Sequence, residues 1–477
     1  MADHRPLVLD VDGTFLKTDM LYETFWAGLG TAPIATLKAA FSNFRNPAAL
    51  KAELHDIAPI RTDLLPVNEE IAALAKGARG EGREVFLASA SDGRLVEKLS
   101  QNHGFDGALG STPTHNLKGA RKAEALVKEF GAKGYIYAGD DRSDMAIWEK
   151  ASHSIVVGSA SGSARKLALA GHGVTEVAHG WKARDLLKAL RPHQWVKNIL
   201  LVLPMLAAHK FDMATLTLFL MGFVAFSAAA SCIYLVNDLL DLEADRLHPK
   251  KCKRPFASGA VPIRVGMWMT ALLGLVALGL GAWLSSAFLL VIAVYMTVSL
   301  AYSLKLKRMR WVDIFILATL YTLRVVAGAV ATQVEASIFM LIFIFPVFVT
   351  LGCVKRLTEL TLATNDERLP GRGYGRLDRE DLLNVAGIGM AGALVIFFLY
   401  SFSAQAQLLY PTQWVLWVAL IPIAGWLFRM IRLGWQGKQD YDPIVFALKD
   451  KRGIGLLLIT LALMIYATDQ WRALFVS

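Results

Sequence analysis

Few of the 477 residues are cysteine or carry a charge. The three cysteines, Cys232, Cys252 and Cys353, are odd in number and far apart, so the sequence gives no basis for a disulfide framework or a zinc site. Charged residues make up 19% of the chain and hydrophobic residues 55%, which fits a disordered chain and a soluble globule poorly. Residues 1–6 lack the apolar run of a signal peptide, and we expect the N-terminal part to stay in the cytoplasm.

The net charge of +10 is distributed unevenly along the chain. Residues 1–188 hold 23 Lys and Arg against 23 Asp and Glu, whereas residues 189–477 hold 27 against 17. The excess of positive charge therefore lies in the more apolar part. This pattern favours a membrane protein with cationic loops over a nucleic-acid binder.

Apolar runs recur after residue 195, with about the 20 residues that are needed to cross a bilayer. With a cytoplasmic N-terminus, the four loops that return to the cytoplasm hold 22 Lys and Arg residues, whereas the outer segments hold only Lys210 and Arg472. This asymmetry predicts a C-terminus on the opposite side of the membrane. The nine predicted spans are residues 196–209, 214–236, 263–284, 286–303, 312–331, 337–354, 382–402, 413–433 and 454–472.

The first part of the chain has a different pattern. Short β-type runs (LVLDV, EVFLAS, YIYAGD and SIVVG) alternate with helical stretches between Leu7 and Arg184, as in an α/β domain with a parallel sheet. We therefore predict a multi-domain chain. Residues 1–185 form the α/β domain, and residues 186–477 form an all-α transmembrane bundle of nine helices.

Four carboxylates follow two of the predicted strands. Asp10 and Asp12 lie two residues apart at the end of the first strand, where alternating side chains can both lean into one site. Asp140 and Asp144 follow the strand that begins at Tyr135. Ligands bind at the carboxyl ends of strands in open α/β sheets, and oxygen ligands suit Mg²⁺. The sequence therefore predicts a Mg²⁺ site at this edge of the sheet.

The order of these motifs resembles that of the haloacid dehalogenase superfamily of phosphohydrolases. The resemblance lies in DxDGT at residues 10–14, a serine at a strand end (Ser89), a following lysine, and GDxxxD at residues 139–144. It covers about residues 5–180. It implies a Rossmann-like fold with a helical cap at about residues 15–80.

The resemblance also implies roles for individual side chains. Asp10 would be the nucleophile that forms an aspartyl phosphate, and Asp12 would be the general acid and base. Ser89 and Lys122 would hold the phosphoryl oxygens, with Lys118 as the alternative lysine. The competing interpretation is a folded relic that binds metal without turnover. The implied Mg²⁺ ligands are Asp10, Asp12, Asp140 and Asp144.

The second apolar run ends in an acidic motif made of Asn237, Asp238, Asp241 and Asp245. Residues three or four apart share a helix face, so the four side chains are expected to form one ridge where the helix leaves the bilayer. Three carboxylates crowded there repel one another and lose hydration, which a divalent cation such as Mg²⁺ would offset. The alternative is an exposed cytoplasmic helix end.

Cationic segments follow the acidic motif and the fourth apolar run, at residues 246–255 and 302–313. Arg and Lys are the usual partners of phosphate oxygens. Arg324 lies eleven residues beyond Asp313, roughly 16 Å deeper along a helix. A charge at that depth indicates function, with Asp313 or a substrate phosphate as counter-ion. A purely structural ion pair is the alternative.

These features resemble the UbiA superfamily of intramembrane prenyltransferases, in which NDxxDxxxD ends the second span, a second polar motif follows the fourth, and nine helices surround a cavity. The resemblance covers about residues 190–475. Aromatic-acceptor members usually carry an acidic DxxxD second motif, whereas Asp313 stands alone among cations. The stretches that are similar to the polyprenyl-phosphate phosphoribosyltransferase branch are residues 191–198, 302–307, Asp313 with Arg324, 355–359 and 371–374.

The branch resemblance implies transfer of 5-phosphoribosyl from phosphoribosyl diphosphate to a polyprenyl phosphate in a bacterial inner membrane, with no nucleic-acid partner. Asp238, Asp241 and Asp245 would be catalytic by holding Mg²⁺ and the diphosphate. The N-terminal domain would remove the 5-phosphate from the product or from a related phosphate ester. The implied substrate-binding residues are Lys197, Asn237, Lys253, Arg254, Tyr302, Lys305, Lys307, Arg324 and Arg356, together with Ser89 and Lys122 of the first domain.

Two other functions compete with this hypothesis. One is UbiA-type transfer of a polyprenyl group from its diphosphate to an aromatic acceptor such as 4-hydroxybenzoate. The other is a transporter or lipid-binding protein with a regulatory soluble domain. A transporter would spread ionisable residues along a path through several spans, whereas here they gather at one face, apart from Arg324.

Overall fold

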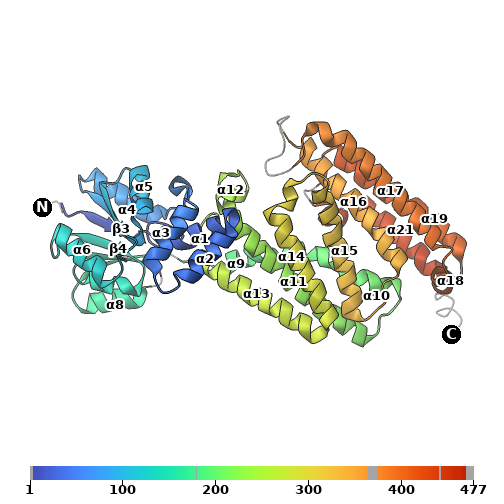
Figure 1. Ribbon diagram of the computed structural model, residues 1–477, viewed down its shortest axis with the longest axis horizontal. Coiled ribbons are helices and arrows are strands. Elements are labelled where there is room, and N and C mark those ends of the chain that lie inside the picture. The colour runs from blue at the N-terminus through green and yellow to red at the C-terminus, as the bar shows by residue number, and fades with distance from the viewer. Residues whose placement is uncertain (1–3, 159, 179, 364–372, 440–441, 469–477) are drawn as a thin grey trace. The chain divides into compact units, whose positions relative to one another are not determined.

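The computed structural model describes residues 4–158, 160–178, 180–363, 373–439 and 442–468 (Figure 1). Residues 371 and 372 and Arg472, which entered the sequence analysis, lie outside the described residues. The chain forms two compact units, each described by itself: the first contains residues 1–190 and 234–270, and the second contains residues 191–233 and 271–477. A domain boundary after residue 185 stays a prediction.

The first unit contains a six-stranded parallel sheet in the order β3-β2-β1-β4-β5-β6. The predicted parallel α/β fold is therefore confirmed. β3 and β6 escaped the sequence analysis because β3 is rich in glycine and β6 is mostly exposed. The strands are β1 Leu7–Leu9, β2 Val85–Asp92, β3 Gly107–Ser111, β4 Ile136–Gly139, β5 His153–Val157 and β6 Gly173–Val177.

Apolar side chains cover both faces of the sheet. Leu7 and Leu9 of β1 join the core on one face and Val8 joins the core on the other, because successive strand residues point to opposite faces. Helices α4 Glu69–Gly80 and α5 Gly93–His103 pack on the first face. Helices α6 Ala120–Phe130, α7 Met145–Trp148 and α8 Ser161–Leu169 pack on the second. The central strand β1 is thus fixed from both sides.

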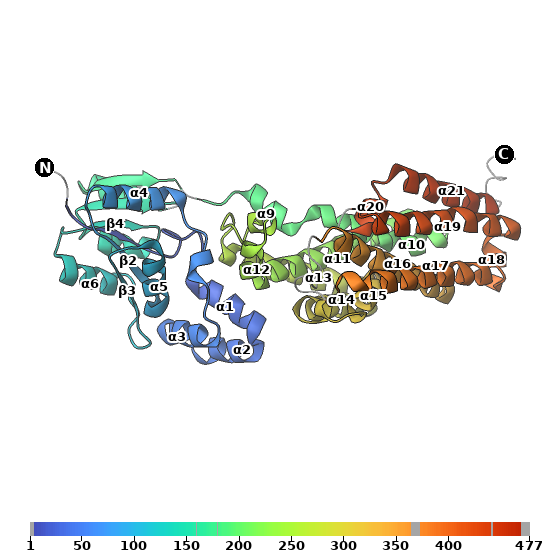
Figure 2. The same cartoon turned by 90° about the horizontal axis from the view of Figure 1, so that it is seen from above.

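The helical cap predicted at residues 15–80 is formed by only part of that range. Helices α1 Met20–Thr31, α2 Pro33–Ser42 and α3 Pro47–Ile57 contact one another, and Figure 2 shows them grouped apart from α4. The short helix η1 Thr62–Leu64 follows them. α4 buries Ile71, Ala75 and Ala78 against the core of the sheet. It therefore belongs to the sheet layer and not to the cap.

Other elements of the first unit lie outside the sheet layers. They are η2 Arg142–Asp144, α9 Ala183–Leu190, the end of α11 (Met213–Leu240), α12 Leu242–Leu247, η4 Lys251–Lys253 and the start of α13 (Ile263–Leu284).

Seven helices in the described part of the chain are long and apolar enough to cross a membrane. Large apolar side chains such as Trp283 of α13 and Leu290 of α14 are exposed. Such surfaces are unfavourable in water and are typical of lipid-facing helices. The seven are α11, α13, α14 Ser286–Leu304, α15 Val312–Thr332, α16 Ile338–Thr361, α17 Arg379–Tyr400 with the preceding turn η6 Arg376–Asp378, and α19 Gln413–Trp435.

The bundle of nine spanning helices is not confirmed, because the first and last predicted spans differ from the prediction. Residues 196–209 fall in the 3-10 segment η3 Pro192–Val202 and the five-residue helix α10 Leu203–Ala207. Pro204 cannot donate a backbone hydrogen bond there. The last helix, α21 Lys451–Ala467, has 17 residues, and the described chain ends at residue 468. The remaining short elements are η5 Leu306–Arg308, α18 Ala404–Leu409 and α20 Pro443–Ala447.

Candidate functional site

Asp10 directly follows β1, between the ends of β2 and β4. Its Oδ1 accepts a hydrogen bond from Lys122 Nζ at 2.7 Å. Lys122 is buried and also donates to Tyr137 Oη at 2.9 Å, and the Tyr137 hydroxyl donates to Asp144 at 3.2 Å. Lys118 is exposed. Of the two lysines that the sequence left open, the structure brings Lys122 to the predicted nucleophile.

Three carboxylates converge beside Lys122. Asp10, Asp140 and Asp144 each place one oxygen within 4.8 Å of the others. Burial raises the pKa of Asp10 to about 7 and that of Asp140 to about 8, and repulsion between these carboxylates adds to both shifts. A divalent cation would neutralise the charges that burial makes unfavourable. The oxygen-only donor set therefore fits Mg²⁺.

A glycine is required next to this cluster. Gly13 has a φ of +77°, and a Cβ atom there would lie 2.3 Å from Asp140 Oδ2. The hydroxyl of Thr14 donates to Asp140 Oδ1 at 3.2 Å. The Gly–Thr pair of the DxDGT motif thus leaves room for Asp140 and orients it.

Asp12 faces a different group of side chains. Its Oδ2 accepts from Ser91 Oγ at 2.6 Å and from Ser89 Oγ at 3.3 Å, and its Oδ1 accepts from Met20 N at 2.8 Å. The predicted strand alternation does not apply here, because β1 ends at Leu9. In the described residues, the cluster of three metal-binding oxygens does not include Asp12.

Three polar residues at this site were missed by the sequence analysis. Ser91 follows Ser89 by two positions, so strand alternation could have identified it. Asp19 caps the first turn of α1, and burial raises its pKa to about 7. Lys51 of the cap helix α3 donates to the carbonyl of Ala90 at 2.6 Å. No local pattern marks Lys51, because only the folded cap brings it there.

The metal-free protein is expected to lose stability as the pH rises from about 6 to about 8, and Mg²⁺ is expected to restore it. The folded pKa values of Asp10 and Asp140, about 7 and about 8, lie above the ordinary value of 3.8, so the folded state binds more protons than the unfolded state in this window. Deprotonation therefore costs stability and also removes the proton that competes with Mg²⁺. The rise in melting temperature on adding Mg²⁺ should be larger at pH 8 than at pH 6.

Asp144→Asn is the matched variant for this measurement, because it removes one carboxylate of the cluster and keeps Asp10 and Asp140. The difference in Mg²⁺ effect between pH 6 and pH 8 should shrink in this variant. An equal Mg²⁺ effect at both pH values in the wild type would contradict the prediction.

In the acidic motif, Asp238 and Asp245 converge on one guanidinium group. Both side chains are 2% exposed, and Arg254 Nη1 donates to Asp238 Oδ1 at 3.1 Å and to Asp245 Oδ2 at 2.6 Å. Burial raises the pKa of Asp245 above its ordinary value, and the charge of Arg254 opposes that rise. Since one nitrogen reaches both carboxylates, they are close enough to share a cation.

The acidic motif is interrupted at Asp241. α11 ends at Leu240 and α12 begins at Leu242, and Asp241 between them has a φ of −100° and a ψ of 15°. The helix is therefore broken at Asp241, although Asp241 N still donates to the carbonyl of Asn237 at 3.0 Å and Asp245 N to that of Asp241 at 2.8 Å. Asp238 and Asp245 of the predicted ridge meet at Arg254, and a place for Asp241 beside them stays a prediction. Across the described residues, the motif does not bring three acidic oxygens within 4.8 Å of one another.

Asn237, which precedes Asp238 in the sequence, carries a buried acceptor. Its Oδ1 has no hydrogen-bond partner within the described part of the chain. An unsatisfied buried acceptor costs about 1–3 kcal/mol. Two carboxylates and an amide oxygen form a donor set that fits a hard cation whose other positions go to substrate oxygens.

Arg324 is buried in α15 of the second unit. Its Nε donates to Asn198 Oδ1 and its Nη2 to Tyr295 Oη, both at 3.1 Å. The guanidinium also lies 5.0 Å from the centroid of the Tyr295 ring, a distance suited to a cation–π contact. Asp313, a predicted counter-ion, is eleven residues away on the same helix, roughly 16 Å along its axis. Asp313 pairs with Arg356. Of the two counter-ions expected for Arg324, Asp313 is therefore corrected, and a substrate phosphate stays a prediction.

Arg356 and Asp313 form an ion pair in which neither side chain has exposed surface. Arg356 Nη2 donates to Asp313 Oδ1 at 2.8 Å and to Tyr302 Oη at 3.0 Å, and Arg356 also pairs with Glu359. The hydroxyl of Tyr302 donates to Asp313 at 2.9 Å. Arg356 and Tyr302, both expected to bind substrate, thus contact protein groups here.

Arg356→Gln is expected to destabilise the protein by about 3–5 kcal/mol, because it leaves the buried Asp313 carboxylate without its cation. Thermal unfolding of the detergent-solubilised protein measures the change. Lys305→Gln, at an exposed position, is the control and should unfold like the wild type. A melting temperature of Arg356→Gln equal to that of the wild type would contradict a structural role for the pair.

The other cations expected to hold phosphate differ in exposure. Lys197 is buried and pairs with Asp442. Lys253 and Lys305 are exposed, and Lys307 is half-buried. Lys253 belongs to the first unit with the acidic motif, whereas the others belong to the second unit. The structure therefore gives the position of each cation only relative to the other residues of its own unit.

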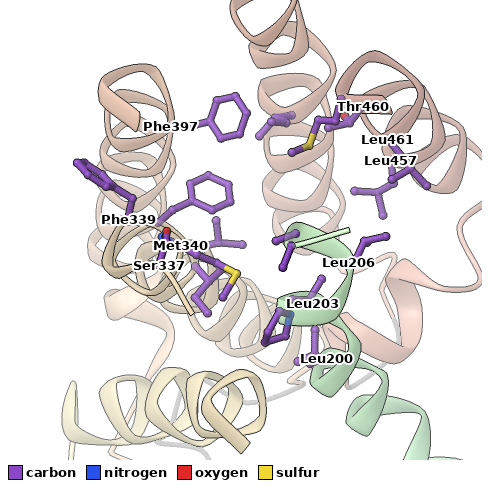
Figure 3. A pocket seen from close by; sticks show the side chains of 18 of the residues that line it. Leu200, Leu203, Leu206, Ser337, Phe339, Met340, Phe397, Leu457, Thr460 and Leu461 are labelled. Carbon is purple, nitrogen blue, oxygen red and sulfur yellow. The ribbon is translucent and has the colours of Figure 1, made fainter. Parts of the chain in front are cut away.

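The second unit contains an apolar cavity of about 1260 Å³ (Figure 3). It is larger than the roughly 300–1,000 Å³ typical of small-molecule pockets. Leu203 and Leu206 of the α10 region lie on one side, and Met340, Phe397 and Leu457 come from α16, α17 and α21 (Figure 3). Its size and lining suit a long hydrocarbon chain.

Comparison with known proteins gives matches along most of the chain. Residues 199–450 match the UbiA prenyltransferase family. An uncharacterised protein of Sinorhizobium fredii is 34% identical over 471 residues, 96% of this chain and 90% of that protein. The decaprenyl-phosphate phosphoribosyltransferase of Mycobacterium tuberculosis is 43% identical over 274 residues, 56% of this chain and 88% of that enzyme. A solved UbiA homologue from Archaeoglobus fulgidus, bound to GPP and Mg²⁺, covers 60% of this chain and 99% of its own with 15% identity and a TM-score of 0.44.

Proposed function

Because the chain belongs to the UbiA prenyltransferase family, we propose that it is a bifunctional membrane enzyme that transfers 5-phosphoribosyl from phosphoribosyl diphosphate to a polyprenyl phosphate. The N-terminal domain then removes the 5-phosphate from the product or from a related phosphate ester. The observation that carries the transferase proposal is the 43% identity to 88% of an enzyme named decaprenyl-phosphate phosphoribosyltransferase.

The acidic motif supports the transfer step. Asp238, Asp245 and Asn237 are the residues that would hold Mg²⁺, which supplies positive charge to a diphosphate leaving group. Arg254, which both carboxylates already contact, would donate to diphosphate oxygens. An oxygen of the lipid phosphate forms a bond to ribose C1 while the bond from C1 to the diphosphate breaks. The reaction therefore needs no protein nucleophile.

The apolar cavity supports a lipid acceptor. Its lining near Leu203, Met340 and Phe397 offers a long hydrocarbon chain a surface without charge (Figure 3). A polyprenyl chain in this cavity would be withdrawn from water, which is favourable by roughly 25 cal/mol for each Å² of apolar surface.

The site around Asp10 supports phosphate ester hydrolysis. Asp10 would attack phosphorus while Lys122, at 2.7 Å, offsets the charge on the phosphoryl oxygens. Asp12, oriented by Ser91 and Met20 N, would protonate the leaving group and then take a proton from water.

The proposed orientation is that of a multi-pass protein of a bacterial inner membrane, with the N-terminal domain in the cytoplasm and the C-terminus in the periplasm.

Incubation of the purified full-length protein with Mg²⁺, polyprenyl phosphate and ribose-labelled phosphoribosyl diphosphate tests the proposal. The expected result is a labelled lipid that first carries and then loses one phosphate. Absence of labelled lipid, with prenylation of 4-hydroxybenzoate from a polyprenyl diphosphate, would replace the proposal by the aromatic alternative.

A further inference from the structure

Arg246, the residue after Asp245 of the acidic motif, forms a buried ion pair with Glu23 of the cap helix α1. Arg246 Nη2 donates to Glu23 Oε1 at 2.6 Å, and Nη1 donates to Oε2 at 3.0 Å. The side chains are 7% and 3% exposed, and both residues lie in the first unit. A bidentate pair of this kind fixes distance and orientation together.

Glu23 is also tied to the segment that carries Asp12. The hydroxyl of Thr18 donates to Glu23 Oε1 at 2.6 Å. Gly13 N donates to the carbonyl of Thr18 at 3.2 Å, and Met20 N donates to Asp12 Oδ1 at 2.8 Å. The partner of Arg246 therefore stands on the same short segment as the predicted general acid.

A second contact joins the same two segments. Gly259 has a φ of +70°, and a Cβ atom there would lie 2.5 Å from Lys17 Cβ and 3.1 Å from Pro66 Cγ. The loop of residues 246–261 thus approaches the start of the cap closely at a point separate from the ion pair. Only glycine fits this approach without a shift of the backbone.

Arg246 closes the part of the loop that contains Arg254. Its Nε donates to the carbonyl of Ala257 at 3.0 Å, so the ends of residues 246–257 are held together. Arg254 lies inside this closed segment and reaches Asp238 and Asp245 from it. The position of Arg254 therefore depends on the position of Arg246.

We propose that Glu23 is a positioning residue for the acidic motif, an inference that rests on the proposed transferase function. Glu23 holds Arg246 and, through it, the loop that presents Arg254 to the two carboxylates. Without Glu23 the Arg246 guanidinium loses its buried partner one residue from Asp245, where it competes with Mg²⁺ for the motif. The N-terminal domain is thereby part of the transferase site as well as the carrier of a second reaction.

Glu23→Gln tests the proposal in the full-length protein, since glutamine keeps the shape and an acceptor for Thr18 but removes the charge. The Mg²⁺ concentration for half-maximal transfer and the KM for phosphoribosyl diphosphate should rise about 10- to 100-fold, the usual effect of losing a residue that supports metal ligands. The maximal rate should fall less. Glu69→Gln is the control, because the Glu69 side chain is 93% exposed and its ion pair with Lys17 is long, at 3.8 Å. Its Mg²⁺ requirement and its KM should equal those of the wild type.

The double variant Glu23→Gln/Arg246→Gln separates a shared role from two independent ones. Because both changes break the same pair, the double variant should be no worse than the worse single variant. Effects that multiply, or a Mg²⁺ requirement of Glu23→Gln equal to that of the wild type, would overturn the proposal. If Glu23→Gln does not fold, Glu23→Asp replaces it and should show a smaller rise in the Mg²⁺ requirement, whereas no rise would overturn the proposal.

Inorganic pyrophosphate with Mg²⁺ distinguishes this inference from the proposed function. The probe should raise the melting temperature of the wild type more than that of Glu23→Gln. Asp238→Asn serves as the reference in which this rise is lost completely. If the wild type forms no labelled lipid but shows this difference in melting temperature, the proposed function is contradicted and the positioning role is supported. If the wild type forms labelled lipid and Glu23→Gln gives the same results as the wild type in both assays, only the positioning role is contradicted.

Discussion

Asp10→Asn is expected to lower the kcat for hydrolysis of 4-nitrophenyl phosphate by at least about 10⁴-fold. An amide oxygen is a poor nucleophile, and the change also removes the charge that Lys122 contacts at 2.7 Å. One of the three clustered carboxylates is lost at the same time. The purified full-length protein, assayed with Mg²⁺, gives the measurement.

Lipid extracted after transfer by the Asp10→Asn protein should keep its 5-phosphate, so its mass should exceed that of the wild-type product by one phosphate group. Glu124→Gln is the matched control, because Glu124 is exposed on the helix that carries Lys122. More than a tenth of wild-type hydrolysis in the Asp10→Asn protein would contradict the role of Asp10 as nucleophile.

Asp238→Asn is expected to reduce the formation of labelled lipid by about 10²- to 10³-fold. Asp238 is one of two buried carboxylates that converge on Arg254, and its loss leaves Asp245 alone to attract a divalent cation. Hydrolysis of 4-nitrophenyl phosphate by the same preparation should not change, which shows that the first unit is still folded.

Glu243→Gln on α12 is the control for this variant, since Glu243 is exposed and lies between Asp241 and Asp245 in the sequence. It should transfer at the wild-type rate. Equal losses in Asp238→Asn and Glu243→Gln would show that the effect is one of general charge and not of the buried pair.

The meeting of Asp10 and Asp140 could be predicted although 129 residues separate them. Each follows a buried strand, and β1 and β4 are parallel neighbours, so their carboxyl ends share one edge of the sheet. Lys122 could be predicted only as one of two lysines, because the choice depends on where α6 begins. The helix starts at Ala120, so Lys122 lies in its first turn, whereas Lys118 lies before it and is exposed. The motif order determines which residues meet, whereas the exact start of the helix selects between close candidates.

Other features could not be predicted from local patterns. The break between α11 and α12 at Asp241 leaves no mark on the apolar periodicity. The 3-10 geometry of η3 lies in a run that is apolar enough for a span. Arg254 was expected to bind phosphate, but its place between Asp238 and Asp245 depends on the fold of its loop. Contacts that tertiary structure creates have no sequence period to reveal them.

The Glu23–Arg246 pair shows the same limit, since its partners are 223 residues apart and belong to different predicted domains. Glu23 lies in a helical stretch of the α/β domain, and Arg246 follows an apolar run of membrane length. In the sequence Glu23 is one charge of a helical stretch, and Arg246 is one of several cations expected near phosphate. Only their burial against each other distinguishes them.

The first unit is assembled from two stretches of chain, residues 1–190 and 234–270, with the start of the bundle between them. During translation the sheet emerges from the ribosome first, because synthesis runs from the N-terminus. Glu23 has no partner for its ion pair until Arg246 is synthesised, and Arg246 follows the whole of α11. We expect maturation of the N-terminal domain to depend on insertion of α11, and a nascent chain halted at residue 190 to leave the Glu23 carboxylate open to water.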